Sequence, residues 1–195
     1  MSINVFAGYY EDPNPKRNIE LQECVVRNIE NTLINYVLIE SKDRLKYNDF
    51  FKVINEYSSI SDVNVITNLD IYIDQETCHL MNRIKEKQMF ALCRWEKDRS
   101  GRIVFANRPD SQDAWVFRGH VTGVNCDFHL GYAGCDNRVA KVFEDHGWSV
   151  TNPSKSIKTI HIHTSNVRNY LSGNKRTLVV PGPYLTISPT EIGAE

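Results

Sequence analysis

Two polar side chains interrupt an apolar segment in the first half of the chain. Asn68 and Asp70 follow the apolar residues of segment 63–66 and stand two positions apart. Alternate residues of a strand face the same side, so both side chains can point into one cleft. Carboxylate and amide oxygens suit a hard divalent cation such as Mg²⁺ or Mn²⁺. The pair therefore predicts a metal site, and the alternative is a turn, in which Asn and Asp are common.

A pair of histidines has the same spacing much later in the chain. His161 and His163 stand two positions apart in a short apolar segment. On a strand they share one face, which is compatible with a single metal site, or with one metal ligand and one phosphate contact. A lone histidine is more often structural, but a pair on the same face indicates a candidate site.

Three further charged residues stand where the apolar pattern breaks. Asp136 precedes an apolar helical segment, where it can cap the helix or act as a general base toward an acceptor hydroxyl. Asp113 ends a polar triplet that leads into an aromatic strand, where it can lie at the rim of a cleft or simply in a turn. Arg94 lies within the otherwise apolar segment 90–95. A buried guanidinium there requires an anionic partner, either a carboxylate or a phosphate.

Apolar periodicity predicts the elements that must position these residues. We expect strands over 3–7, 34–40, 63–73, 89–95, 114–119 and 159–163, and helices over 19–31, 47–57, 76–87 and 137–146. The alternation of strand and helix in the first half is typical of an α/β fold, a Rossmann-like, mostly parallel sheet with helices on both faces. Ligands bind at the carboxyl ends of the strands in such sheets, so we expect the site there. No segment has the composition of an interdomain linker, so residues 1–195 are predicted to form one domain.

Composition narrows the classes of function. The chain has 23 Lys and Arg against 24 Asp and Glu, which argues against a protein that binds nucleic acid by bulk charge. No segment approaches the roughly 18 apolar residues of a membrane span, and the first residues lack the pattern of a signal peptide. The five cysteines are scattered and contain no CxxC pair. They favour free thiols in a reducing compartment, so we expect a cytoplasmic protein.

The order of these motifs resembles a small GT-A-fold, family-2-like glycosyltransferase domain of the kind found in bacterial and viral proteins. The similarity extends from about residue 4 to about residue 189 and is strongest over 63–95 and 111–170. The motifs that carry it are Asn-Leu-Asp at 68–70, Arg-Trp at 94–95, Ser-Gln-Asp-Ala-Trp at 111–115, Gly-Cys-Asp-Asn at 134–137 and His-Ile-His at 161–163.

The resemblance implies a metal-dependent, inverting glycosyltransferase with a GT-A-like fold. Its donor would be a nucleotide sugar of the UDP- or GDP-sugar class. Asp70, with His161 or His163, would hold Mn²⁺ or Mg²⁺ on the diphosphate, and Asp136 would be the general base, with Asp113 as the next candidate. The residues implied to contact the nucleotide sugar are Phe6, Gly8, Tyr10, Glu40, Asn68 and Arg94.

Two departures from the family pattern leave alternatives open. Asn68 stands where the family motif has a carboxylate, which can weaken metal binding or transfer part of it to Asp74. The chain is also short for this fold, so the acceptor (a glycan, a protein or a modified nucleic acid) and the oligomeric state are not predicted. One alternative is a non-catalytic domain that binds a nucleotide or a sugar. Another is a metal-dependent hydrolase in which Cys126, His129 and Cys135 join the histidine pair.

Overall fold

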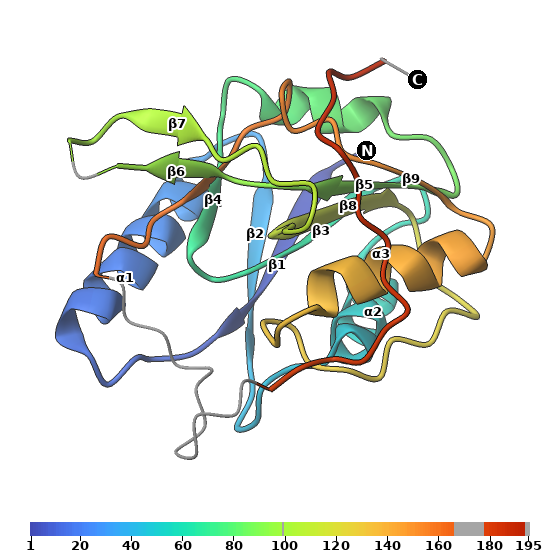
Figure 1. Ribbon diagram of the computed structural model, residues 1–195, viewed down its shortest axis with the longest axis horizontal. Coiled ribbons are helices and arrows are strands. Elements are labelled where there is room, and N and C mark those ends of the chain that lie inside the picture. The colour runs from blue at the N-terminus through green and yellow to red at the C-terminus, as the bar shows by residue number, and fades with distance from the viewer. Residues whose placement is uncertain (99, 166–177, 194–195) are drawn as a thin grey trace.

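The computed structural model describes residues 1–98, 100–165 and 178–193 (Figure 1). Within these ranges the helices are α1 (Pro15–Glu30), α2 (Tyr47–Tyr57), the 3-10 helix η1 (Cys78–Arg83) and α3 (Cys135–Asp145). The strands are β1 (Ile3–Tyr9), β2 (Asn35–Glu40), β3 (Val63–Thr67), β4 (Ile71–Ile73), β5 (Gln88–Leu92), β6 (Trp95–Lys97), β7 (Ile103–Phe105), β8 (Ala114–Arg118), β9 (Ser149–Thr151) and β10 (Thr159–His161). In the described part of the chain, no helix has the length and apolar character needed to cross a membrane.

The central sheet has six strands in the order β2-β1-β3-β8-β5-β9. β8 runs antiparallel to its neighbours β3 and β5, while the remaining neighbours pair in parallel. The first residue of β8, Ala114, pairs with Thr67 and with Leu92, the last residues of β3 and β5. The residues before β8 therefore lie at the same edge as the carboxyl ends of the parallel strands. The predicted α/β class is confirmed, with a mixed, mostly parallel sheet.

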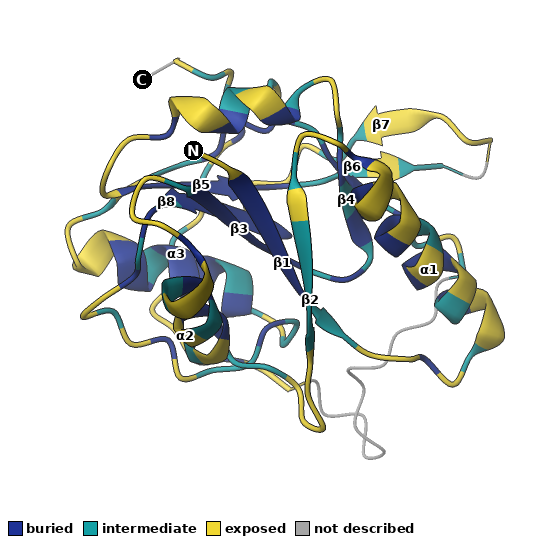
Figure 2. Ribbon diagram, turned by 180° about the vertical axis from the view of Figure 1, so that it is seen from behind, coloured by how far each residue is buried: buried dark blue, intermediate teal, exposed yellow. Residues whose placement is uncertain are grey.

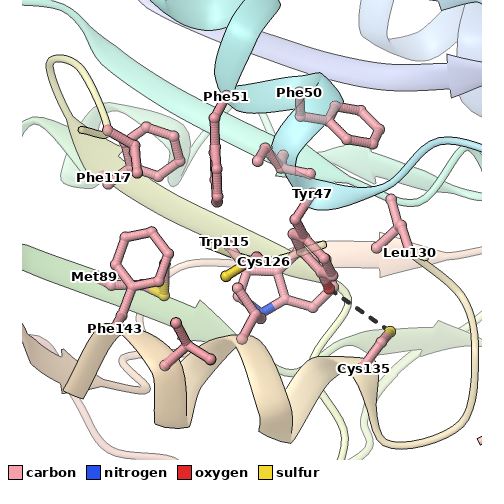
Figure 3. Packing of buried hydrophobic residues seen from close by; sticks show 14 of the residues in the cluster. Tyr47, Phe50, Phe51, Met89, Trp115, Phe117, Cys126, Leu130, Cys135 and Phe143 are labelled. Carbon is pink, nitrogen blue, oxygen red and sulfur yellow. Dashed lines mark hydrogen bonds between the residues drawn. The ribbon is translucent and has the colours of Figure 1, made fainter. Parts of the chain in front are cut away.

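Helices cover both faces of this sheet, as predicted. α2 and α3 pack on one face, where Tyr47 of α2 meets Trp115 edge to face at 5.2 Å between ring centroids (Figure 3). Phe143 of α3 lies 5.8 Å from Phe51 of α2, so the two helices share one core. α1 and η1 bury apolar residues against the other face. The inner strands are buried, while the edge strand β2 is partly exposed (Figure 2).

A second, smaller sheet joins two distant parts of the chain. Its order is β4-β10-β6-β7, with β10 antiparallel to β4. The register pairs His161 with Ile71, and the backbone N–H of Ile162 donates to the carbonyl of Asp70 at 3.1 Å. This pairing brings the late histidine segment to the turn that follows β3.

The C-terminal segment 178–193 passes beside α3 (Figure 1). The N–H of Leu185 donates to the carbonyl of Asn137 at 3.0 Å, and the N–H of Ile187 donates to that of Pro109 at 3.0 Å. These bonds fix the start of α3 and the loop before β8, which lie together at the edge of the central sheet.

Three of the predicted elements differ from the structure. The strand predicted over 89–95 divides into β5 and β6, which belong to different sheets. Segment 63–73 is not one strand, because the chain turns after Thr67, where the N–H of Asn68 donates to the carbonyl of Asp113 at 3.3 Å. β3 and β4 therefore belong to different sheets. The helix predicted over 76–87 is reduced to the short η1, and β7 and β9, each of three residues, were not predicted.

Candidate functional site

A cavity of about 630 Å³ opens at the carboxyl edge of the central sheet. The segments after β1, β2, β3 and β5 line it, together with the loop before β8, the beginnings of α1 and α3, and the end of β10. The predicted site residues that line it are Gly8, Tyr10, Asn68, Asp70, Arg94, Asp113, Asp136, His161 and His163. Residues that are far apart in the sequence thus surround one cavity, at the edge where the fold class predicts a ligand.

Two predicted nucleotide contacts lie elsewhere. Phe6 is fully buried in the core and packs edge to face on Tyr57, with 5.6 Å between ring centroids. It offers no surface to a ligand, so the prediction is wrong for this residue. Glu40 is exposed at the end of β2 and is not among the lining residues, whereas the segment 41–45 that follows it is.

Asp70, His161 and His163 form a group that can hold a metal ion. One potential ligand atom from each lies within 4.8 Å of the other two, and among the described residues no other group of three His, Cys, Asp or Glu does so. Oδ2 of Asp70 is hydrogen-bonded to Nε2 of His161 at 3.0 Å and accepts from the guanidinium of Arg17. Oδ1 of Asp70 is buried and has no hydrogen-bond partner in the described part of the chain.

This donor set fits one of the two predicted ions better than the other. A buried carboxylate oxygen without a partner is costly, and a cation bound to Oδ1 of Asp70 would remove that cost. Mg²⁺ takes oxygen ligands in near-ideal octahedral geometry, whereas two of the three ligands here are imidazoles. The residues present therefore fit Mn²⁺ better than Mg²⁺.

Asp74 does not share in this group. Its Oδ1 accepts from the N–H of Thr77 at 3.0 Å and from the Thr77 hydroxyl at 2.9 Å, at the start of η1. Asp74 is also absent from the cavity lining. The alternative in which it compensates for Asn68 is therefore wrong.

Arg17, in the first turn of α1, is a site residue that the sequence did not predict. The side chain of Asn14 caps this helix and accepts from the N–H of Arg17 at 3.4 Å. The guanidinium donates to Asp70, to Oε2 of Glu20 at 3.0 Å and to the carbonyl of Ile162 at 3.0 Å. No local pattern distinguishes this residue, because an arginine near the start of a surface helix is ordinary.

These neighbours set the charge of Asp70. Burial by itself would raise the pKa of Asp70, but His161 and Arg17 outweigh it and hold the pKa well below its usual range. Burial lowers the pKa of His161, but the adjacent carboxylate more than offsets this and raises it. Asp70 is therefore an anion at neutral pH.

Asp113 ties together three segments at the edge of the sheet. Its Oδ1 accepts from Nδ2 of Asn68 at 2.9 Å, and its Oδ2 accepts from the guanidinium of Arg94 at 2.9 Å. Arg94 also donates to Glu96 at 2.9 Å. The anionic partner that was predicted for Arg94 is thus a carboxylate, and Arg94 lies between β5 and β6 rather than inside a strand. Because both oxygens of Asp113 are engaged, it is poorly placed to take a proton from a ligand.

Asp136 lies in the first turn of α3 and not at its N-cap. The cap is Gly134, whose φ of +80° is in the left-handed region, so the predicted capping role of Asp136 is wrong. Oδ2 of Asp136 accepts from the N–H of Gln112 at 3.2 Å, and Oδ1 accepts from the N–H of Asn137 at 3.0 Å. Burial raises the pKa of Asp136 to about 6, against the lowering effect of these two bonds. A carboxylate with this pKa suits a general base near neutral pH.

Two basic residues that follow β2 complete the cavity. Lys42 and Arg44 both line it, and neither forms a salt bridge with an acidic residue in the described part of the chain. The guanidinium of Arg44 donates to the carbonyl of Leu130 at 3.2 Å and lies over the ring of Tyr132. Arg108, at the rim, is paired with Asp110 at 2.8 Å. Unpaired cations at the mouth of a cavity favour an anionic ligand such as a phosphate.

The metal centre of the hydrolase alternative is not formed. Cys126 and Cys135, the first residue of α3, are buried in the core that α2 and α3 share, where the Tyr47 hydroxyl lies 3.7 Å from Sγ of Cys135 (Figure 3). His129 is hydrogen-bonded to the carbonyl of Arg44 at 2.9 Å. Within the described ranges these residues do not join His161 and His163 in a ligand group.

No family model matches the chain, and a search of curated proteins finds no match either. Function is therefore inferred from the geometry and chemistry of the cavity.

Proposed function

We propose that the protein is a metal-dependent glycosyltransferase of the GT-A type, which moves a sugar from a nucleotide-diphosphate donor to an acceptor hydroxyl. The observation that carries the proposal is a single cavity that contains both the Asp70–His161–His163 group and Asp136. The resemblance of the sequence motifs to this family supports it, because the residues that it implies for metal binding and for proton transfer come from distant segments and surround one space.

The donor half of the cavity lies around Asp70. Asp70, His161 and His163 would hold Mn²⁺, which supplies positive charge to the diphosphate as the sugar leaves it. Lys42 and Arg44 would bind phosphate oxygens of the same donor. Of the nucleotide contacts implied at the end of β1, Gly8 and Tyr10 line the cavity and would face the base or the ribose.

The acceptor half lies around Asp136. Its carboxylate would take the proton of the acceptor hydroxyl while the hydroxyl oxygen attacks the anomeric carbon and the bond from that carbon to the phosphate oxygen breaks. Attack from the face opposite the diphosphate inverts the configuration. The backbone N–H groups of Gln112 and Asn137 hold the carboxylate in place. The proposal extends to the hydroxyl and not to the molecule that carries it, whether glycan, protein or modified nucleic acid.

A thermal-shift screen of UDP- and GDP-sugars, each with and without Mn²⁺, tests this function. A ligand that binds only the native state raises the melting temperature. We expect at least one donor to stabilise the protein only when Mn²⁺ is present, and the same donor to be consumed with release of its nucleoside diphosphate. A donor that is bound but never consumed would indicate a non-catalytic binding domain. Failure of every donor to stabilise the protein would contradict the proposal.

A further inference from the structure

Arg17 is held between two carboxylates beside the proposed metal ligands. Its side chain is buried, and it bonds to Asp70 on one side and to Glu20 on the other. Glu20 is itself buried and accepts from the hydroxyl of Thr164 at 2.8 Å and from the hydroxyl of Ser165 at 2.8 Å. This network keeps the guanidinium in place and ties α1 to the segment that follows β10.

The positive charge of Arg17, held beside Asp70, acts differently on a bare metal ion and on a metal–diphosphate complex. A bare Mn²⁺ at Oδ1 of Asp70 would share one carboxylate with the guanidinium of Arg17, and the two cations would repel each other. The diphosphate of a nucleotide sugar is a diester with two negative charges, which cancel the two positive charges of the ion. Inorganic pyrophosphate carries more than two negative charges at pH 8. The repulsion is then removed or reversed. Both effects are strengthened because the side chains of Arg17 and Asp70 are only 6% and 14% exposed.

We infer that Arg17 is a specificity-determining residue, which makes the Asp70–His161–His163 group select metal–diphosphate complexes over the bare metal ion. The inference rests on the metal site of the proposed function. A purely structural role for Arg17 predicts something different, because loss of a residue that only positions Asp70 would weaken the binding of both forms together.

The test compares Mn²⁺ binding with and without inorganic pyrophosphate at pH 8, by calorimetry and by the electron paramagnetic resonance of free Mn²⁺. The variants are Arg17→Gln and the double variant Arg17→Gln/Glu20→Gln. The single variant leaves the buried carboxylate of Glu20 without its cation, whereas the double variant removes both charges of the pair and serves if the single variant folds poorly. The matched control is Arg27→Gln on the same helix, whose guanidinium pairs with Glu23 at 2.9 Å, away from the cavity.

We expect removal of Arg17 to tighten the binding of bare Mn²⁺ and to weaken that of the Mn²⁺–pyrophosphate complex, each by about fivefold or more, while Arg27→Gln changes neither. Parallel losses in both affinities would overturn the inference and leave Arg17 as a positioning residue. Affinities that neither variant changes would also overturn the inference about Arg17. Binding of Mn²⁺ by the wild type would in that case still support the metal site. If neither the wild type nor any variant bound Mn²⁺ in either condition, the inference and the proposed metal site would fail together.

Discussion

Asp70 and Asp136 are two carboxylates that line the same cavity, and their surroundings move their pKa values in opposite directions. Both are partly buried, and burial alone would raise the pKa of each. Asp70 has Arg17 and His161 against it, so its pKa falls well below the usual range. Among the described residues, the hydrogen bonds to the Asp136 carboxylate come from backbone N–H groups, and burial raises its pKa to about 6.

The neighbours of a carboxylate, more than its burial, therefore determine whether it acts as a cation ligand or as a base. A carboxylate that stays charged can hold a metal, whereas one that titrates near neutral pH can accept and release a proton. Asp113, a third carboxylate of the cavity, bonds to both Asn68 and Arg94 and is suited to neither role.

The largest effect is expected for Asp136→Asn. The carboxamide has almost the same shape but cannot accept a proton, so transfer should fall by about 10²–10⁴-fold while donor binding stays unchanged. The measurement is turnover of the stabilising donor together with its affinity by calorimetry. Asp110→Asn, at the rim of the same cavity, is the matched control. Full transfer activity in Asp136→Asn would show that the base is another residue.

Asp70→Asn should affect the donor half of the cavity. Loss of the charged ligand is expected to weaken Mn²⁺-dependent donor binding by about a hundredfold or more, because a neutral amide is a much poorer ligand for the cation. Calorimetric titration of Mn²⁺ with the donor measures this. Asp43→Asn removes an exposed acid from the same cavity and should leave the affinity unchanged. Equal affinities of Asp70→Asn and the wild type would exclude Asp70 as a metal ligand.

The raised pKa of Asp136 also predicts how stability changes with pH. The folded protein takes up a proton at this group near pH 6, whereas the unfolded chain does so only at lower pH. Ionisation therefore destabilises the folded wild type as the pH rises from about 4 to about 7. Over this range the free energy of unfolding of Asp136→Asn should rise, relative to that of the wild type, by on the order of 2 kcal/mol. Urea unfolding at several pH values measures this, and parallel profiles would show that Asp136 titrates normally.

The smallest effect is expected for Lys42→Ala, which tests the phosphate contact after β2. Lys42 is exposed, so its charge should contribute only about 1 kcal/mol, or about a fivefold change in the affinity for pyrophosphate with Mn²⁺. The difference should shrink at high salt, because screening weakens exposed charges. Lys52→Ala, on α2 and outside the cavity, is the control. An effect that persists at high salt would mean that Lys42 acts through something other than its charge.

Local periodicity predicted most elements of the sheet and its helices. The pattern of α2 gave its bounds, Tyr47–Tyr57, because one apolar stripe faces the core throughout. The same-face spacing of His161 and His163 also marked a pair that lies beside Asp70. Such signals are local, since they depend on which side of an element is buried.

The remaining features depend on contacts between distant segments. The direction of β8 brings Asp113 to the carboxyl edge of the sheet, and strand direction leaves no mark in the periodicity of a buried strand. Arg17 reaches Asp70 only because α1 packs beside the turn after β3. Asp136 looked like a helix cap because Asp is common there, but Gly134 takes that position.

Anomalous diffraction from crystals grown with Mn²⁺ and UDP or GDP would test the central claim most directly. We predict a manganese peak at coordinating distance from Oδ1 of Asp70 and from at least one of His161 and His163, with the diphosphate bound to the same ion. A bound nucleotide with no manganese at Asp70, or a manganese peak at another site, would contradict the account.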